Sequence, residues 1–326
     1  MPSEFDLIDR YFKRNAKSAV LGIGDDAAIV EPSPGMQILM STDMLVAGTH
    51  FFADAEPEAL GWKTLAVNIS DLAAMGAIPR WALLAMSLPT FEDAADEEWL
   101  DKFARGFFAC AESFGVELIG GDTTRGPMNF CVTIFGEAPI GKALLRSGAK
   151  VGDDIWVSGH PGRAALGLAH LQSRCVLPDD QREKCLSALH QPQPRVALGL
   201  ALRGIATTVI DVSDGLLADL GHIADASNVT MDIVLACVPM PLRDGEIATE
   251  LIRNCVLAGG DDYELAFTAP TDKREQVQAL PDQLLLALTL IGSVSEKGNG
   301  RIRVLDSTGL PVTIAGSGYD HFESPS

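Results

Sequence analysis

The sequence predicts an α/β (α+β) protein of two domains, and three observations support this expectation. The chain has 326 residues, which is too long for one ordinary core and fits two domains of roughly 150 residues each. Segments with helical and strand-like apolar spacing alternate irregularly along it. A stretch rich in glycine and lysine, GKALLRSGAKVGDD at residues 141–154, interrupts this alternation. We therefore expect one domain at residues 1–146 and a second at residues 147–326.

In the first half, apolar side chains recur at the spacing of helices or strands. Leu65, Ile69, Leu72 and Met75 follow one another at intervals of three or four residues, which predicts a helix. Gly115 ends a second long helix that has its aromatic residues on one face. In chain order, we expect a helix at Glu4–Arg14, strands at Ser18–Val30 and Met36–Thr42, a helix at Glu58–Gly76, a strand at Trp81–Leu88, a helix at Ala94–Phe114, and strands at Val116–Ile119 and Phe130–Gly136.

The second half repeats this mixture of strands, turns and helices. A polar stretch bounded by proline occupies Leu177–Pro194, and a glycine-rich turn, GHPG, follows the first strand. Short β-branched runs alternate with longer amphipathic segments. We expect strands at Asp154–Ser158, Thr207–Val212, Met231–Leu235, Tyr263–Thr268, Leu286–Ile291 and Arg301–Leu305, with helices at Arg163–Gln172 and Leu216–Ala226.

The charge of the chain excludes some classes of partner. Lys and Arg number 25 and Asp and Glu number 44, for a net charge of −19. Nucleic acids and anionic membranes both require a basic face, so we expect neither as a partner. A phosphorylated substrate stays possible, because divalent metals can lie between carboxylates and phosphates.

The cysteines and the N-terminal residues indicate a cytoplasmic protein. The six cysteines are widely spaced and form no CxxC pair, which is typical of reduced thiols. The first residues, MPSEFDLIDRYFKR, lack the apolar stretch of a signal peptide. The longest apolar runs are far shorter than the ~20 residues of a membrane span.

Aspartates recur beside Gly, Ser or Thr at the ends of strand-like runs in both halves. A single Asp in such a place is usually a helix cap or a turn residue. The repetition favours one carboxylate cluster in one cleft, where hard cations such as Mg²⁺ would offset the mutual repulsion. These residues are Asp25 and Asp26 in LGIGDDAA, Asp43 in LMSTDM, Asp71 in NISDLAAMG, Asp122 in LIGGDTT, Asp211 and Asp214 in VIDVSDGL, and Asp261 and Asp262 in LAGGDDYE.

Two glycine-rich segments have the spacing of nucleotide-binding motifs without the required context. GEAPIGKA at 136–143 has P-loop spacing, but Ala143 replaces the hydroxyl residue that should hold Mg²⁺. GIGDDA at 22–27 leads into IVEPSPG and not into a helix. We reject both as phosphate-binding loops.

With these residues considered, the whole chain resembles the thiamine-monophosphate kinase family of the aminoimidazole ribonucleotide synthetase-like ATP-binding superfamily. The motifs that carry the resemblance are GIGDDAA, STDMLVAGTHF, NISDLAAMGAIP, LIGGDTTRG, RSGAKVGD, DVSDGLLADLGHI, GGDDYELAF and GSGYDHF. The resemblance implies the two-domain fold of that superfamily, with an N-terminal sheet that forms the interface of a homodimer. It also implies transfer of the γ-phosphate of ATP directly to thiamine monophosphate, with several Mg²⁺ ions, giving thiamine diphosphate and ADP.

The same resemblance implies a role for individual residues. Asp43, Asp71, Asp122 and Arg146 would be the catalytic residues, and Gly121, Asp122, Arg146 and Ser213 would contact ATP. The acceptor substrate would contact His50, Asp261 and Tyr319, although the family commonly has Glu at the position of Asp261. The magnesium ligands would be Asp26, Ser41, Thr42, Asp43, Asp71, Asp122, Asp211 and Asp214.

The chemistry of phosphoryl transfer is compatible with these assignments. Its loose transition state requires positioning and charge neutralisation more than a strong base. A phosphate acceptor is already ionised near neutral pH, so the transfer needs no general base. The aromatic face of Tyr319 suits a flat cationic thiazolium.

Three other functions stay open, as do ordinary structural roles for His50, Arg146 and Tyr319. A sister enzyme of the superfamily would phosphorylate an amide or carbonyl oxygen, or selenide, but the YDHF sequence near the C-terminus disfavours it. A metal-dependent phosphatase would release phosphate from a monoester without ATP. A catalytically silent nucleotide- or thiamine-binding regulator would not need the intact set of aspartates.

Overall fold

The computed structural model describes residues 4–90, 94–242, 247–314 and 318. The chain divides into two compact units, one made of Met1–Leu72 and Ala77–Gly141, the other of Ala73–Gly76 and Lys142–Ser326. Each unit has its own sheet. Separate folding of domains at 1–146 and 147–326 stays a prediction.

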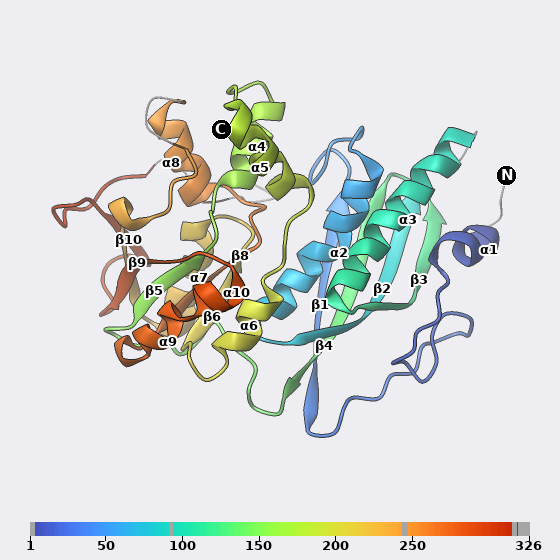
Figure 1. The fold of residues 1–326 in the computed structure, drawn as a ribbon, viewed down its shortest axis with the longest axis horizontal. Helices are drawn as coiled ribbons and strands as arrows, with labels where there is room; N and C mark the ends of the chain where they lie inside the picture. Colours follow the sequence, from blue (N-terminus) through green and yellow to red (C-terminus); the bar gives the residue numbers. More distant parts are fainter. Residues whose placement is uncertain (1–3, 91–93, 243–246, 315–317, 319–326) are drawn as a thin grey trace. The chain divides into compact units, whose positions relative to one another are not determined.

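The first unit is a four-stranded sheet with two long helices packed over it (Figure 1). The strand order is β1–β4–β2–β3, with β4 antiparallel to both of its neighbours and β3 parallel to β2. Its elements are α1 (Glu4–Leu7), the π-helical turn η1 (Ile8–Phe12), β1 (Met36–Val46), α2 (Pro57–Ala74), β2 (Ile78–Leu88), α3 (Ala94–Phe114), β3 (Glu117–Arg125) and β4 (Asn129–Pro139).

Two glycines allow α2 and α3 to pack with their backbones in contact. A Cβ atom on Gly61 would lie 2.0 Å from the carbonyl oxygen of Phe103, and one on Gly106 would lie 1.7 Å from that of Glu58. Only glycine tolerates so close an approach. Both helices therefore cover the same core, whose fully buried side chains include Leu65, Ile69, Leu72, Trp81, Phe103, Phe107, Phe130 and Ile134.

The expected strand at Ser18–Val30 is wrong. The segment makes only isolated bridges, between Leu21 and Ile29 and between Ile23 and Asp25. Its apolar side chains do not form a buried face, since Val20 is 64% exposed and Ile29 is 51% exposed. The segment has the residue pattern of a strand, but no neighbouring strand pairs with it. It is therefore a loop.

The second unit contains a six-stranded sheet of order β10–β7–β9–β5–β8–β6, in which only the β10–β7 pair is parallel. Alternating side chains of one strand enter two different cores: Ile155 and Val157 lie in one, and Trp156 lies in the other. Both faces of this sheet are therefore buried. The strands are β5 (Asp154–Ser158), β6 (Thr208–Val212), β7 (Thr230–Val234), β8 (Glu264–Ala269), β9 (Leu288–Ser295) and β10 (Ile302–Leu305).

Helices supply the remainder of both cores. Residues of α4, α7 and α8 contribute to one core, and residues of α6, α9 and α10 contribute to the other. The helices of this unit are α4 (Arg163–Leu171), α5 (Asp179–His190), α6 (Val196–Leu202), α7 (Leu216–Ser227), α8 (Thr249–Ala258), α9 (Arg274–Gln278) and α10 (Leu280–Leu284), with 3₁₀ turns η2 (Leu235–Cys237) and η3 (Thr271–Lys273). Among the described residues, no helix combines the length and apolarity needed to cross a bilayer.

Candidate active site

Strand β1 and helix α2 bring three of the predicted site residues together. The hydroxyl of Ser41 donates a hydrogen bond to Oδ2 of Asp71, and the amide of Asp43 donates to Oδ1 of Asn68 at 3.0 Å. Ser41 and Asp43 share a strand face because they are two residues apart, and Asn68 and Asp71 share a helix face because they are three apart. The carboxylates of Asp43 and Asp71 therefore belong to one polar cluster.

Thr42 is turned to the other face of β1, as strand alternation requires. Its hydroxyl donates to the carbonyl oxygen of Val132 at 3.0 Å and lies 3.1 Å from the hydroxyl oxygen of Thr133, on the neighbouring strand β4. Thr133 and Cys131 line a cavity of the first unit. The predicted ligands Ser41 and Thr42, adjacent in sequence, thus project in different directions.

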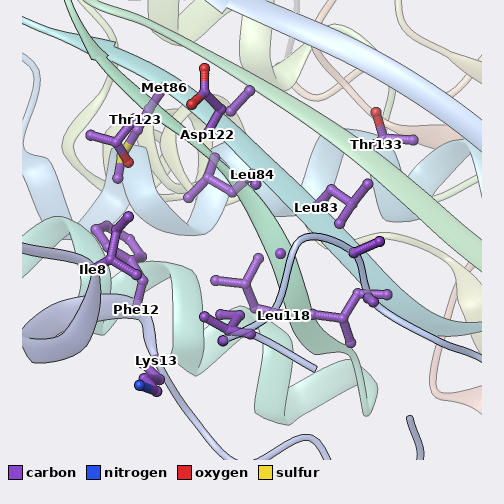
Figure 2. Close-up of a pocket in the computed structure, with 18 of the residues that line it drawn as sticks. Ile8, Phe12, Lys13, Leu83, Leu84, Met86, Leu118, Asp122, Thr123 and Thr133 are labelled. Atoms are coloured by element: carbon purple, nitrogen blue, oxygen red, sulfur yellow. The ribbon is translucent and has the colours of Figure 1, made fainter. Parts of the chain in front are cut away.

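This cavity, of about 1130 Å³, brings Asp25 and Asp26 of the Ser18–Val30 loop together with Asp122 of β3. Figure 2 shows Asp122 and Thr123 near Met86, above the apolar side chains of Ile8, Phe12 and Leu118. A polar, acidic edge next to an apolar floor is the usual composition of a small-molecule site. The first unit therefore contains a cavity with an acidic edge and an apolar floor, where a phosphate would require cations between it and the carboxylates.

Gly121 is required by the geometry of the strand that carries Asp122. Its φ is +152°, and a Cβ atom there would lie 1.8 Å from the carbonyl oxygen of Leu84. Only glycine allows β3 to approach β2 this closely. The pairing places Asp122 opposite Ala85, beside the cavity.

His50 has one of its ring nitrogens committed to its own loop. Nδ1 accepts a hydrogen bond from the amide of Val46 at 3.0 Å. A ring nitrogen that accepts carries no hydrogen, so Nε2 carries the ring hydrogen. His50 can therefore donate from Nε2 to an anionic oxygen.

In the second unit, a buried carboxylate holds the turn between β6 and α7. Oδ2 of Asp219 accepts hydrogen bonds from the amides of Ser213 at 3.0 Å, Asp214 at 3.1 Å and Gly215 at 3.2 Å. Burial, with the nearby charge of Asp214, raises the pKa of Asp219 to about 7, while the three amide hydrogen bonds lower it. The predicted residues Ser213 and Asp214 are thus held by a third residue that the motif analysis did not select.

The backbone of Asp261 is joined to the same turn. Its amide donates to the carbonyl oxygen of Ser213 at 2.9 Å, and the hydroxyl of Tyr263 donates to its Oδ1 at 3.1 Å. Asp261 and Tyr263 both have positive φ, at +68° and +51°, which costs about 1 kcal/mol or more at each residue. The structure therefore brings a predicted nucleotide contact, Ser213, next to a predicted acceptor contact, Asp261.

Asp262 lies between these two strained residues and has a structural contact of its own. Its carboxylate accepts hydrogen bonds from the amides of Gly162 at 2.5 Å and Ala164 at 3.2 Å, at the start of α4. Burial raises the pKa of Asp262 well above its ordinary value, and the two amides oppose this effect. Asp262 thereby connects the strained segment to α4.

Asp211 belongs to β6, the edge strand of the second unit, and Arg146 follows the residue that is hydrogen-bonded to this strand. The carbonyl oxygen of Leu145 accepts from the amide of Val209 in β6 at 3.1 Å, while Arg146 is exposed. Asp211 is buried within β6, at 4% exposure. Arg146 therefore has a solvent-accessible guanidinium group.

The predicted ligands occupy three places in the described structure: the β1–α2 cluster, the cavity of the first unit, and the end of β6. No group of three or more His, Cys, Asp or Glu side chains there is arranged to hold a metal ion. Tyr319 lies outside the described residues. Their roles as ligands and substrate contacts stay predictions. The sequence placed Asp262 in the expected carboxylate cluster, but the structure has its carboxylate accept from the amides of Gly162 and Ala164. Asp219 was not selected, because it lies four residues after the N-cap Gly215 and so does not match the capping-box spacing.

The fold class of this protein follows from its similarity to known proteins. Residues 24–138 match the family model described as AIR synthase related protein, N-terminal domain. Two solved structures of the hydrogenase maturation protein HypE, both 20% identical to this chain, share its fold at TM-scores of 0.77 and 0.74. The fold class expected from the sequence is confirmed.

The particular family follows from more similar proteins. The thiamine-monophosphate kinase of Escherichia coli is 44% identical over 99% of both chains, and that of Bacillus subtilis is 34% identical over 98% of this chain and 99% of its own. A crystal structure of the Stenotrophomonas maltophilia thiamine-monophosphate kinase is 45% identical, with a TM-score of 0.83, covering 93% of this chain and 96% of that one. The chain belongs to the thiamine-monophosphate kinase family, as the sequence motifs predicted.

Proposed function

We propose that this protein transfers the γ-phosphate of ATP to thiamine monophosphate, giving thiamine diphosphate and ADP, in the biosynthesis of thiamine diphosphate. The observation that carries this proposal is the 44% identity to the Escherichia coli thiamine-monophosphate kinase over 99% of both chains. A structure 30% identical to this chain, with a TM-score of 0.75 over 98% of this chain and 97% of that one, is the complex of AaThiL with AMPPCP and TMP. An ATP analogue and an acceptor phosphate are thus bound together on this fold.

We propose Mg²⁺ as the cofactor, on the chemistry of the predicted ligands. Six carboxylates and two hydroxyls form a donor set made only of oxygen, which is what this hard cation prefers. When bound, Mg²⁺ would neutralise charge on the phosphates during transfer. The ligands are Asp26, Ser41, Thr42, Asp43, Asp71, Asp122, Asp211 and Asp214.

The chain's own residues would bind and orient the two substrates. Gly121 and Asp122 contribute the edge of the cavity, and the accessible guanidinium of Arg146 can hold a phosphate through two parallel hydrogen bonds. Ser213 contributes a hydroxyl from a turn that Asp219 fixes. Preorganised donors of this kind supply most of the catalysis in phosphoryl transfer.

The acceptor would be recognised by its phosphate and by its ring. His50 can donate from Nε2 to a phosphate oxygen, as the hydrogen bond to Nδ1 indicates. The backbone of Asp261 is hydrogen-bonded to that of Ser213. Its carboxylate would suit a cationic thiazolium, and Tyr319 would stack on the same ring. A phosphate acceptor requires no deprotonation, so we expect thiamine monophosphate to be a substrate and unphosphorylated thiamine to be a poor one.

An assay with ATP, Mg²⁺ and either acceptor tests the proposal. We expect stoichiometric ADP and thiamine diphosphate from thiamine monophosphate, and little product from thiamine. Phosphate release from thiamine monophosphate without ATP would identify a phosphatase. Comparable kcat/KM values for the two acceptors would contradict the role given to the acceptor phosphate.

We further propose a homodimer in the cytoplasm. Met40 and Met44, on the face of β1 away from Ser41 and Asp43, are 68% and 53% exposed, and such apolar exposure on a strand suits a subunit interface. The described cysteines are thiols without disulfides, three of them buried, which is compatible with a reducing compartment.

A further inference from the structure

The loop of residues 19–32 carries Asp25 and Asp26 to the cavity without forming a strand. Inside the loop, backbone hydrogen bonds join Val20 and Leu21 to Ile29, and the recorded bridges are isolated ones. A loop of this length has many conformations, and fixing one of them has a cost in entropy. The contacts at its two ends lower this cost, because they fix where the segment carrying the two aspartates begins and ends.

The first end is held by Glu117, at the start of β3. Oε1 of Glu117 accepts from the amide of Lys17 at 2.9 Å, and Oε2 accepts from the amide and the hydroxyl of Ser18 at 2.9 and 2.6 Å. The hydroxyl of Ser18 in turn accepts from Nε1 of the fully buried Trp81 at 2.9 Å. Trp81 is the strand partner of Glu117, so the sheet itself fixes this contact.

The second end is held by Glu137, near the end of β4. Oε1 of Glu137 accepts from the amide of Ser33 at 2.6 Å, and Oε2 accepts from its hydroxyl at 3.0 Å. Glu137 is only 2% exposed. A buried carboxylate with these donors cannot be moved without leaving polar groups unsatisfied.

Arg80 connects the two ends electrostatically. It lies on β2, between β3 and β4 in the sheet, and its Nε is 3.5 Å from Oε2 of Glu137. Burial would raise the pKa of Glu117, but the hydrogen bonds from Ser18 and Lys17 and the charge of Arg80 lower it overall. The acceptor at the first end is therefore the ionised carboxylate, which forms the stronger hydrogen bonds.

We propose that Glu117 and Glu137 are positioning residues for phosphoryl transfer, which hold the loop of residues 19–32 at both ends and so keep Asp25 and Asp26 beside Asp122. This inference rests on the proposed function, in which Asp26 binds Mg²⁺. Neither glutamate needs to contact a substrate. Their effect is to raise the fraction of molecules in which the loop can bind, and apparent affinity scales with that fraction.

Glu117→Gln and Glu137→Gln test the proposal, because each keeps the side-chain shape and replaces one acceptor oxygen by a donor. We expect each to raise the KM for Mg²⁺–ATP and the Mg²⁺ concentration for half-maximal activity by about tenfold, the effect of a loop that is competent ~10% of the time. The KM for thiamine monophosphate should change less than about twofold. Thermolysin should cleave both variants faster within residues 19–32.

Glu112→Gln is the matched control. Glu112 is an exposed residue whose ion pair with Arg14, at 3.0 Å, anchors the same N-terminal segment outside the loop. It should alter neither the Mg²⁺–ATP parameters nor cleavage in the loop. Ser33→Ala removes only one hydroxyl contact, so it should show a smaller effect of the same kind if a Gln variant does not fold.

The outcomes separate the two proposals. A wild-type protein that makes no thiamine diphosphate contradicts the proposed function, whatever the loop does. An active wild type, with variants of lower melting temperature but unchanged Mg²⁺–ATP parameters and cleavage, overturns the positioning role and leaves both glutamates purely structural. Equal increases in KM for both substrates would overturn it as well.

Discussion

Single carboxylates in this protein hold backbone segments as well as proposed metal ions. Asp219 accepts three amide hydrogen bonds on one oxygen, whereas Asp71 accepts from a hydroxyl of the neighbouring strand. The first contact fixes a turn, and the second joins helix α2 to strand β1. The two residues should therefore respond differently to the same chemical change, Asp to Asn.

Asp71→Asn should separate stability from function. Asn can still accept from Ser41, and the lost charge relieves repulsion with Asp43, so without Mg²⁺ the variant should melt at the wild-type temperature or above. With Mg²⁺ and AMPPCP the order should reverse, because a ligand stabilises the state that binds it in proportion to its affinity. Activity should fall by several orders of magnitude. Thermal scans with and without ligand check this, and a variant destabilised without metal but with the full ligand shift would contradict it.

Asp219→Asn should lower both stability and nucleotide affinity. All three amides donate to Oδ2, and the uncharged oxygen of Asn can take its place only with weaker hydrogen bonds, at a cost of about 1 kcal/mol. The KM for ATP should rise more than the KM for thiamine monophosphate. Steady-state kinetics and urea unfolding measure the two effects, and Asp225→Asn, at an exposed residue of the same helix, is the control. Unchanged KM values in a destabilised variant would show that the turn does not contribute to binding.

At the scale of elements, close backbone contacts fix the strands and helices that carry the site. Gly121 allows β3 to approach β2, and the Glu117 contacts join β3 to the segment before the loop. The β2–β3 approach depends on the absence of a side chain at Gly121, and the Glu117 contacts depend on a negative charge. Changing either residue should therefore alter the free energy of unfolding.

Gly121→Ala should destabilise the protein by more than about 2 kcal/mol, since its Cβ atom would collide with backbone that cannot move without breaking strand pairing. Gly115→Ala is the control: its φ of +69° is also unfavourable, but no atom lies within 4 Å of the added Cβ, so about 1–2 kcal/mol is expected. Urea denaturation of both variants measures the difference. Equal losses would mean that conformational strain alone, and not the β2–β3 contact, requires glycine at 121.

The stability contributed by Glu117 should depend on pH in a defined direction. Its pKa is lowered from the ordinary value of 4.5, so the ionised carboxylate stabilises the fold fully above that pH, and the contribution is lost as pH falls through the lowered pKa. The difference in unfolding free energy between wild type and Glu117→Gln should therefore shrink between about pH 5 and pH 3. Denaturant titrations across this range test it, and a difference that does not vary with pH would show that the charge has no role.

At the scale of the whole molecule, each unit has its own sheet and core, while the first unit also exposes an apolar strand face. Met40 is 68% exposed on β1, opposite the face that packs against α2. A strand face of this kind is unfavourable in water unless another surface covers it. A second copy of the chain is the partner that the family resemblance predicts.

Met40→Glu should convert the proposed dimer to a monomer, because a carboxylate buried in an apolar interface would lose its hydration. Light scattering on the wild type and the variant measures the mass. Val176→Glu, at a 79% exposed position of the second unit, should leave the mass unchanged. A monomeric wild type, or a dimeric Met40→Glu variant, would contradict an interface on this face.

Apolar periodicity predicted the elements whose bounds depend on neighbouring residues alone. Helix α3 and strand β5 have the bounds that apolar periodicity predicted, at Ala94–Phe114 and Asp154–Ser158. Helix α5 lies within the polar stretch Leu177–Pro194, where few of its side chains are buried, and periodicity was too weak to show it. The motifs also identified the family, because a motif is matched by the order of its residues and requires no information about contacts.

Which side chains meet depends on how the strands and helices pack. Strand alternation turned Thr42 away from Ser41 and Asp43, and Asp43 and Asp122 lie within their strands and not at the ends, because pairing extends β1 and β3 beyond the predicted runs. The loop at Ser18–Val30 has strand-like residues but no partner edge. Its anchor, Glu117, is 100 residues from Lys17 in sequence. Periodicity describes residues that are neighbours along the chain. These contacts join residues that are distant in the sequence, so no local pattern encodes them.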